Sequence, residues 1–414
     1  MDNWQPQPPP TSGMGDHAVS TLSEHLKGRR IALMVTGGIA ALKIPMLARS
    51  LRKHGAEVVA FLSQEGARYV TEETLAWCTH QPVVTRLTPQ AEHLFDSAPF
   101  DAYLVAPATY NTINKVAHGI ADGTVTSALA TGLGRMSQGR AQVLFAPTMH
   151  GDMHNPILTE SVQKLSKLGC FFIAPRDDYG KHNLPDDDVI LMAVCRALST
   201  STVKGKDFLV TGGPTPVRID NVRRITNKFT GRLGTEIAKT LYARGANVHL
   251  IHGQSTDAPP SFLPHETVSD YEAYVTSVQG YLQTKQPAAA IFSAAVADYV
   301  PSQIELGKVQ SGNPKWELSL VPTKKVIDEV HSAFPELCMV TFKYQENCSH
   351  EDLMAIAQER LQRGYKMVVV NRGEEKSPSG QQVAYLVTPQ SQKRFEGKPQ
   401  IAHAIVDWLE GHCI

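Results

Sequence analysis

Two short stretches of this 414-residue sequence place a pair of glycines directly after an apolar run. The first, IALMVTGG, ends at Gly37 and Gly38, and the second, FLVTGG, ends at Gly212 and Gly213. Glycines at the end of a strand let the backbone approach a phosphate, and the following helix offers unbonded N–H groups and the positive end of its dipole. A bare glycine pair is also typical of a simple tight turn, so the chemistry depends on the residues nearby.

The second glycine turn continues into a cationic segment, TGGPTPVRIDNVRRITNKFTGRLGTEIAK, from Thr211 to Lys239. Its arginines and a second glycine pair, Gly231 and Gly234, precede a helical pattern. Backbone donors and positive side chains near one helix N-terminus are suited to phosphate groups. The charge by itself is equally typical of a solvated loop.

Polar residues also follow two later strands in the first half of the chain. They lie in APATYNTINKVAHGIADGTVTSALAT (106–131) and in APTMHGDMHNP (146–156). In open α/β sheets, ligands bind at the carboxyl ends of the strands. Three strand ends that carry Gly, Thr, Asn and His therefore predict a ligand site in the first half.

The elements that position these residues form a repeated pattern. Each glycine turn lies between an apolar strand and an amphipathic helix that ends at a glycine before a second apolar strand, which is a βαβ unit. Further apolar runs alternate with helical segments: DAYLVAPAT and AQVLFAPTM, then AAAIFSAAVADY, LCMVTFKY and YKMVVVNR. Continuous apolar strands imply sheets that are covered on both faces. We predict an α/β protein of two Rossmann-like, three-layer domains with mainly parallel sheets.

The composition of the chain places the domain boundaries. Residues 1–28 are polar and Pro-rich, without the regions of a secretory signal, so we expect a disordered leader. A Ser, Thr, Gly and Lys-rich stretch predicts a linker at 198–206. The first domain is then expected at 29–197 and the second at 207–414.

Charge, hydropathy and cysteine spacing bound the class of protein. Forty basic residues balance forty acidic ones, so the net charge indicates neither a nucleic-acid partner nor a membrane. The apolar runs are shorter than the roughly 18–20 residues that span a bilayer. The six cysteines are scattered without a CxxC pair, which argues against a disulfide framework or a cysteine-rich zinc site and favours a cytoplasmic location.

The first domain resembles the flavin-dependent cysteine decarboxylases, in particular the phosphopantothenoylcysteine decarboxylases. TGGIAA, APATxNTxxKxAxGIAD and PxMHxxM occur in that family's order over roughly residues 30–195. The resemblance implies that His93, in AEHLFD, is catalytic, and histidine suits proton handling near neutral pH. It implies that FMN is bound by Gly37, Gly38, Ile39, Ser63, Thr109, Asn111, Thr124 and Thr126.

Two positions depart from the commoner pattern of that family. His150 stands where many members have an Asn that holds the substrate carboxylate. The flap segment APRDDYGKHNLPDDD has no Cys, where many members have one that completes the redox cycle. Other branches of the family share both features, so the departures indicate a subfamily trait. Lys181 or His182 is then the expected proton source on the flap.

The second domain resembles the phosphopantothenate–cysteine ligases, whose TGGPTxxxIDxVRxITNxSSGxxG pattern it follows, with Phe229 in place of a Ser. A carboxylate must be activated by a nucleotide before an amine attacks it, which needs cations around a triphosphate. The resemblance implies that Asn227 holds the acyl-nucleotidyl intermediate and that Lys308 acts in catalysis and nucleotide binding. Further nucleotide contacts are implied at Ala294, Asp298, Pro322, Thr323, Lys324, Lys325, Phe342 and Arg363. CTP or ATP is the implied co-substrate, with Mg²⁺ expected on charge grounds.

The two resemblances occur in the order of a fused enzyme of coenzyme A biosynthesis. They imply ligation of 4'-phosphopantothenate with cysteine, followed by decarboxylation to 4'-phosphopantetheine. Two alternatives stay open: an active ligase whose flavin domain has lost decarboxylation, and a flavoprotein that serves as a non-catalytic regulatory subunit. The families imply trimer contacts for the first domain and dimer contacts for the second, hence a homo-oligomer and, by resemblance, a dodecamer.

Overall fold

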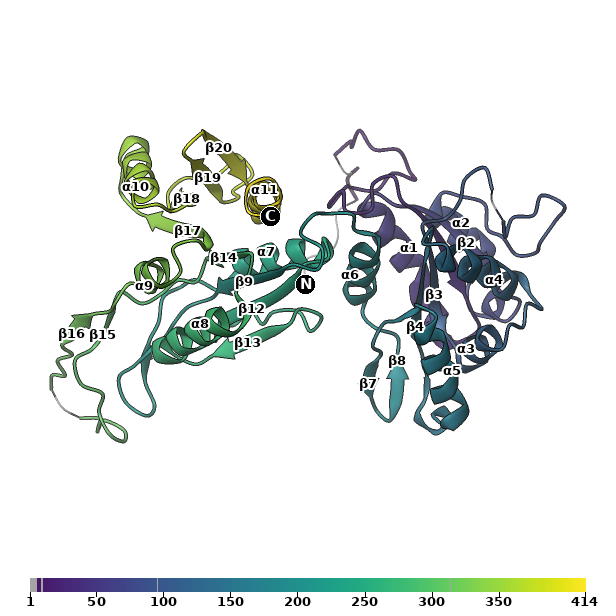
Figure 1. Ribbon diagram of the computed structural model, residues 1–414, viewed down its shortest axis with the longest axis horizontal. Coiled ribbons are helices and arrows are strands. Elements are labelled where there is room, and N and C mark those ends of the chain that lie inside the picture. The colour runs from purple at the N-terminus through teal and green to yellow at the C-terminus, as the bar shows by residue number, and fades with distance from the viewer. Residues whose placement is uncertain (1–5, 9, 95, 313) are drawn as a thin grey trace. The chain divides into compact units, whose positions relative to one another are not determined.

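The structure is a computed structural model that describes residues 6–8, 10–94, 96–312 and 314–414. The chain divides into two compact units, Met1–Leu198 and Ser199–Ile414. Each unit is a sheet flanked by helices (Figure 1). The prediction of two Rossmann-like α/β domains with mainly parallel sheets is confirmed.

The first unit is built on a five-stranded parallel sheet with the strand order β2-β1-β3-β4-β6. Its strands are β1 (Arg30–Val35), β2 (Glu57–Leu62), β3 (Ala102–Ala108), β4 (Gln142–Pro147) and β6 (Phe171–Phe172). A separate three-stranded antiparallel sheet contains β5 (Met149–His150), β7 (Arg176–Asp178) and β8 (Lys181–Asn183). Its helices are η1 (Ile39–Lys43), α1 (Ile44–Lys53), η2 (Gly66–Arg68), α2 (Glu72–Thr79), α3 (Tyr110–Ala117), α4 (Thr124–Ser137), η3 (Gly151–Met153), α5 (Pro156–Lys167) and α6 (Asp187–Leu198).

Both faces of this sheet are covered. Side chains from α3, α4 and α5 pack with Met34, Phe61, Val105 and Phe145 in one core. Helices α1 and α6 contact each other away from that core, and α6 also contacts β3 and β4. All five strands run parallel, so their carboxyl ends meet at one edge of the sheet.

The second unit has an eight-stranded sheet with the strand order β13-β12-β9-β14-β17-β18-β19-β20. In this order, each pair of neighbours from β13 through β12, β9, β14 and β17 to β18 is parallel. Strand β19 pairs antiparallel with β18 and with β20. The strands of the sheet are β9 (Asp207–Gly212), β12 (Asn247–Gly253), β13 (His265–Val268), β14 (Ala289–Phe292), β17 (Cys338–Gln345), β18 (Met367–Arg372), β19 (Val383–Thr388) and β20 (Ser391–Glu396). Two small hairpins pair β10 (Val217–Arg218) with β11 (Arg224–Ile225) and β15 (Tyr299–Pro301) with β16 (Leu320–Pro322).

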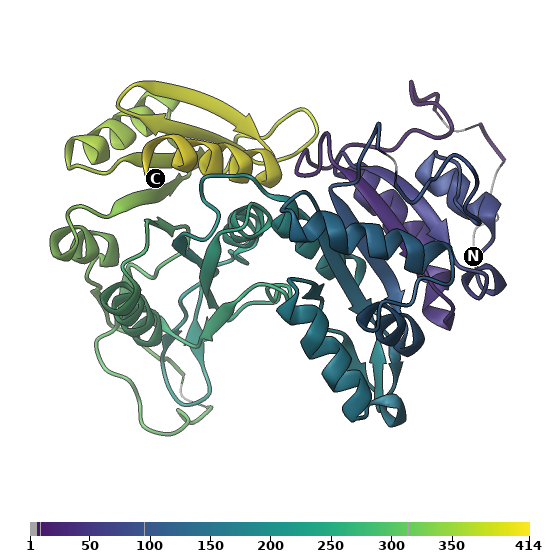
Figure 2. The same cartoon turned by 45° about the vertical axis from the view of Figure 1, so that its right-hand side comes forward.

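Two groups of helices cover this larger sheet. Helices α7 (Arg232–Ala243) and α11 (Lys398–His412) pack into one core with Phe208, Val210 and Val340. Helices α8 (Tyr271–Lys285), α9 (Val326–Ala333) and α10 (His350–Gln362) pack into the other with Leu209, Val368 and Val370. Successive residues of one strand thus enter opposite cores, which explains the continuous apolar runs. Figure 2 shows the C-terminal strands and α11, in yellow, gathered together.

Two features differ from the sequence-based expectations. The predicted leader, 1–28, contacts the domain from His17 onward: Arg52 donates to His17 O at 2.9 Å, the Leu22 N–H donates to Lys53 O at 2.8 Å, and Leu26 is fully buried. Cys338 and Cys413 form a disulfide, a pairing that their 75-residue separation in sequence concealed. The structure places Cys78, Cys170 and Cys195 as buried free thiols.

Neither a membrane span nor a metal site stands out in the described part of the chain. No helix there is long and apolar enough to cross a bilayer. The same residues hold no group of three or more His, Cys, Asp or Glu side chains arranged to ligate a metal.

Candidate active sites

The first candidate site lies at the carboxyl edge of the five-stranded sheet. Gly38, after β1, lies beside Thr109, after β3, because a Cβ on Gly38 would be 3.6 Å from the Thr109 methyl carbon. Gly37 is packed against Glu65, whose Cβ would lie 2.5 Å from an added Cβ, so a larger residue cannot fit there without a shift. The third predicted strand end adjoins them, because the Thr148 N–H after β4 donates to Ala108 O at the end of β3 at 3.1 Å. The structure thus brings the three predicted strand ends together.

The predicted flavin residues divide into those with local partners and those with exposed side chains. The Thr109 hydroxyl caps α3 by accepting the Thr112 N–H at 3.4 Å, and the Thr126 hydroxyl accepts the Gly123 N–H at 2.9 Å. The Thr124 hydroxyl donates to Thr85 O at 3.1 Å. Asn111 and Ile39 are exposed. Ser63 accepts the Gly66 N–H at 3.0 Å and shapes the turn after β2.

His93 lies in a turn between α2 and β3. Its Nδ1 atom is buried and has no hydrogen-bond partner among the described residues. The turn is held from α4, since Arg135 donates to Leu94 O and pairs with Asp96 at 3.1 Å. An orphaned, buried ring nitrogen on a histidine is a group that a ligand or a second chain can satisfy.

The flap is joined to the loop that carries His150. Strand β8 pairs with β5, which places His150 opposite Lys181 and Met149 opposite His182. The Gly151 N–H donates to Gly180 O at 2.9 Å, and a Cβ on Gly151 would lie 2.6 Å from that oxygen. The His150 Nδ1 accepts the Asp152 N–H at 3.2 Å. The two departures from the commoner family pattern therefore lie in one small sheet.

A chain of polar side chains crosses this sheet. His182 Nδ1 lies 2.6 Å from Asp177 Oδ1, and His182 Nε2 lies 3.3 Å from His154 Nδ1. Because a carboxylate only accepts, His182 Nδ1 donates to Asp177, which assigns the tautomer of the neutral ring. The sequence pointed to Lys181 or His182. It did not point to Asp177 or His154, whose contacts with His182 depend on strand pairing.

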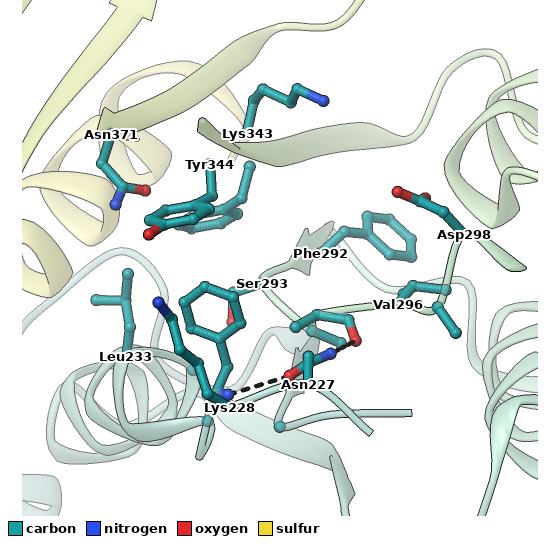
Figure 3. A pocket seen from close by; sticks show the side chains of 18 of the residues that line it. Asn227, Lys228, Leu233, Phe292, Ser293, Val296, Asp298, Lys343, Tyr344 and Asn371 are labelled. Atoms are coloured by element: carbon teal, nitrogen blue, oxygen red, sulfur yellow. Dashed lines mark hydrogen bonds between the residues drawn. The ribbon is translucent and has the colours of Figure 1, made fainter. Parts of the chain in front are cut away.

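The second candidate site is a cavity of about 850 Å³ in the second unit. It lies at the carboxyl ends of β9, β14, β17 and β18, and the N-terminus of α7 lines it as well (Figure 3). Seven of the residues predicted from the sequence line it, and five of them are Ala294, Asp298, Thr323, Lys324 and Lys325. Asn227 and Phe342 also line it.

Asn227 is held at both ends of its amide group. Its Nδ2 donates to Ala295 O at 2.8 Å, and its Oδ1 accepts the Phe229 N–H at 3.1 Å. Figure 3 shows Asn227 on the wall of the cavity between Ser293 and Val296. Phe229, which replaces the usual Ser, packs edge-on against Tyr344 with ring centroids 5.0 Å apart. Asn227 is therefore oriented by the backbone around it.

Asp298 and the turn before α9 form one arm of the cavity. Thr323 donates its N–H to Asp298 O at 2.9 Å and its hydroxyl to Ala297 O at 2.7 Å. Lys325 and Asp298 form an ion pair. The predicted Pro322 ends β16 and does not line the cavity.

Two of the cations predicted to contact the nucleotide, Arg363 and Lys308, do not line the cavity. Arg363 pairs with Glu359 at the end of α10 and does not line the cavity. Arg360 does line it, and its Nη1 donates to Phe342 O at 2.9 Å. Residues three apart lie only about 60° apart around a helix, so the helix turn does not separate these two arginines. Their partners do: Arg363, at the C-cap of α10, pairs back with Glu359, whereas Arg360 bonds to Phe342 O.

Lys308 lies in the connection between β15 and β16, outside the cavity lining. Its neighbours are held by the turn at Asp220: the Val309 N–H donates to Asp220 Oδ2 at 3.1 Å, and Gly307 O accepts the Asn221 N–H at 2.9 Å. Asp220 is buried, and burial opposes its ionisation. Hydrogen bonds from the backbone of Arg223, Val222 and Val309 and from the Arg223 side chain outweigh burial and hold the pKa of Asp220 well below its usual value.

The comparisons with known proteins agree with this geometry. Residues 19–199 match the family described as Flavoprotein, and residues 203–412 match the DNA/pantothenate metabolism flavoprotein C-terminal domain. The chain is 36% identical over 359 residues to the coenzyme A biosynthesis bifunctional protein CoaBC of Thermococcus kodakarensis, covering 85% of this chain and 87% of that protein. It is 31% identical to CoaBC of Bacillus subtilis, covering 77% and 80%.

A solved structure, the DNA/pantothenate metabolism flavoprotein from Streptococcus pneumoniae, shares 26% identity with this chain at a TM-score of 0.45. It covers 50% of this chain and is itself covered completely.

The two units and the two sites define a fused enzyme of the α/β class, with a flavoprotein domain followed by a pantothenate-metabolism domain. The chain belongs to the CoaBC family of bifunctional coenzyme A biosynthesis proteins. It is a decarboxylase and a ligase of that pathway, and its first domain is a flavoprotein. The function inferred from the sequence is thereby confirmed.

Proposed function

We propose that the second unit joins 4'-phosphopantothenate to cysteine with CTP or ATP and Mg²⁺, and that the first unit decarboxylates the product to 4'-phosphopantetheine. The ligase reaction is supported above all by the position of Asn227. Its amide is oriented by Ala295 O and the Phe229 N–H on the wall of a cavity that is also lined by cations. A preorganised amide stabilises a developing negative charge without reorganising during the reaction.

Asp298 is the group proposed to face the nucleotide and its Mg²⁺. It lies on the cavity wall, and its carboxylate is balanced by Lys325. Carboxylate and phosphate oxygens are the ligands that Mg²⁺ prefers. Arg360, which lines the cavity, takes the place that the sequence had proposed for Arg363 at the triphosphate.

The residues of the first unit fit FMN. Gly38 and Thr109 lie together at the carboxyl edge of the sheet, where a phosphate can be bound, and the buried Nδ1 of His93 has no hydrogen-bond partner among the described residues. FMN, when bound, supplies the oxidation that allows the carboxylate to leave, and it returns the electrons afterwards. His93 is proposed to handle the proton, and His150, whose Nδ1 is occupied by the Asp152 N–H, to offer Nε2 to the substrate carboxylate.

The flap is proposed to supply a proton through His182. Asp177 contacts Nδ1 of His182 at 2.6 Å, which fixes the tautomer and the orientation of the ring. This arrangement offers an acid on a flap that has no Cys. It supports an active decarboxylase over a flavin domain that has lost its reaction.

The apolar surface next to the first glycine turn is proposed as a subunit interface of a homo-oligomer. Ile39, Leu42 and Met46 are each more than half exposed along η1 and α1. A row of exposed apolar side chains beside a ligand site is typical of a surface that another subunit covers. The cytoplasmic location and the trimer and dimer contacts stay predictions.

The test is a one-pot assay of the purified protein with 4'-phosphopantothenate, cysteine, Mg²⁺ and either CTP or ATP. Mass spectrometry follows the products, and absorbance reports the flavin. We expect 4'-phosphopantetheine from a yellow protein. Accumulation of 4'-phosphopantothenoylcysteine would instead leave only the ligase active, and a yellow protein without either product would support a regulatory subunit. Asn227→Asp should stop pyrophosphate release while decarboxylation of added 4'-phosphopantothenoylcysteine continues.

A further inference from the structure

One side of the ligase cavity is built from elements far apart in sequence. Leu233 of α7 and Asn371 of β18 lie on the opposite side of the cavity from Asp298 (Figure 3). Lys376, after β18, and Lys398, the first residue of α11, line the same cavity. Neither lysine belongs to the motifs that indicated a ligase.

Helices α7 and α11 run side by side in the same direction. Beyond the C-terminus of α7, Arg244 pairs with Glu410 in the last turns of α11 at 3.0 Å, and the N-terminal residues Arg232 and Lys398 are close enough to repel each other. Both helices begin at a glycine, Gly231 and Gly397, without a side-chain cap or an acidic residue in the first turn. Two positive dipole ends therefore meet at the cavity.

The lysines at this end are not neutralised by the protein. Among the described residues, neither Lys376 nor Lys398 has a carboxylate within ion-pair distance. Arg232 is paired with Asp257 at 2.6 Å. Burial lowers the pKa of Lys398, as do the charges of Arg232 and Lys376, with Glu236 opposing them. Lys398 is partly buried, whereas Lys376 is exposed. Neighbouring cations without counter-charges repel each other, and an anion that binds between them relieves that repulsion.

The positions of both lysines are set by backbone contacts. The turn from Lys376 to Gln382 is closed by the Ser377 N–H, which donates to Gln381 O at 2.9 Å. The Gly397 N–H then donates to Gln382 O at 2.8 Å. This contact attaches the turn that carries Lys376 to the residue preceding Lys398, so the two cations are held on one rim.

A buried, unpartnered ring nitrogen points at the same place. His252, at the end of β12, is 1% exposed, and its Nε2 has no hydrogen-bond partner among the described residues. A Cβ on Gly231 would lie 2.2 Å from this Nε2, so the imidazole is directed at the N-terminus of α7. This polar atom is independent of the lysines.

We propose that Lys376 and Lys398, with the adjoining N-termini of α7 and α11, form a phosphate-binding subsite of the ligase cavity. The subsite rests on the proposed ligase function and adds two residues to it. Its ligand is a phosphate or polyphosphate group. Two sources share that chemistry: the triphosphate of the nucleotide and the phosphate ester of 4'-phosphopantothenate.

The test is calorimetric binding of inorganic pyrophosphate to the full-length protein. The variants are Lys376→Gln, Lys398→Gln and the double substitution, with Lys398→Arg as the conservative change. Lys393→Gln removes an exposed charge on β20, outside the cavity, and is the matched control. Loss of one charge-assisted contact weakens binding by roughly tenfold, so we expect about a tenfold rise in Kd for each single variant and more for the double. Lys398→Arg and Lys393→Gln should bind nearly as the unaltered protein does.

Titrations with CTP, ATP and 4'-phosphopantothenate identify the source of the phosphate. A loss confined to the nucleotides assigns the subsite to the triphosphate, and a loss confined to 4'-phosphopantothenate assigns it to the ester. If the double variant retains its thermal midpoint and binds pyrophosphate and all three substrates within about twofold of the unaltered protein, the subsite is wrong. That result would not contradict the ligase function. Conversely, the unaltered protein could bind pyrophosphate through these lysines and still make no ligation product. This outcome would support the subsite and contradict the ligase function.

Discussion

Asp177 and His182 face each other across the flap hairpin, with Asp177 Oδ1 2.6 Å from His182 Nδ1. The register of β7 on β8 makes them direct neighbours, and the same ring reaches His154 through its other nitrogen. A carboxylate beside one ring nitrogen fixes the tautomer and the orientation of the imidazole, so its other nitrogen is directed at a defined partner.

His182→Gln is predicted to slow formation of 4'-phosphopantetheine by about 10²-fold or more, the usual contribution of a general acid. Asp177→Asn should produce a smaller loss, because the His182 ring loses the carboxylate that fixes its tautomer and orientation. Lys181→Gln, on the same strand, should change the rate little. Single-turnover product analysis would reveal the difference, and a larger loss from Lys181→Gln than from His182→Gln would assign the proton to the lysine.

His93→Asn is predicted to abolish CO2 release while the ligase reaction continues at its normal rate. The reason is that the two sites lie in separate compact units, and His93 belongs to the first. The flavin spectrum of the variant should stay that of the bound cofactor. Loss of both activities in a variant that unfolds at the normal temperature would contradict this division of roles.

Arg360→Gln is predicted to raise the KM for the nucleotide by roughly tenfold, since it removes a charge on the cavity wall. Arg363→Gln makes the same chemical change three residues later, on a side chain that pairs with Glu359 outside the cavity. We expect little change from it. Steady-state kinetics of pyrophosphate release compares the two, and an equal or reversed effect would return the nucleotide contact to Arg363. Thermal unfolding controls for the lost bond to Phe342 O.

The stability of the second unit is predicted to fall as the pH drops below about 6.5, the ordinary pKa of histidine. Burial lowers the pKa of His252 in the folded state, so the unfolded chain binds a proton that the folded chain resists. The stabilisation is full above pH 6.5 and is lost as the pH falls toward the lowered value. His252→Gln should flatten this dependence in denaturant unfolding between pH 7 and 5, while the exposed His412→Gln should not. An unchanged slope in His252→Gln would exclude this histidine as the cause.

The Cys338–Cys413 bond is predicted to stabilise the second unit by about 2–4 kcal/mol, because it closes a long loop in the unfolded chain. Dithiothreitol should lower the denaturant midpoint of the unaltered protein and have no effect on Cys413→Ser. Cys348→Ser removes a free thiol and should keep the response to reductant. If the unaltered protein unfolds identically with and without reductant, these two cysteines are thiols in solution.

The sequence by itself determined the features that depend on local pattern. The glycine turns, the βαβ repeats and the three-layer α/β class follow from short-range periodicity, because a strand or helix buries a face that its own residues define. The spaced motifs likewise identified the family. Asn227 lines the cavity as its motif implied, and it is held by bonds to Phe229, two positions away, and to Ala295, which follows β14.

The tertiary structure decided which side chains share a site. Arg360 faces the cavity and Arg363 does not, because the direction of a helical side chain depends on how the helix packs. Asp177 meets His182 through strand register, and Lys376 meets Lys398 because α7 and α11 lie parallel and a backbone hydrogen bond joins Gly397 to Gln382. These contacts are made between segments far apart in sequence, and they are set by packing and pairing that no local pattern encodes.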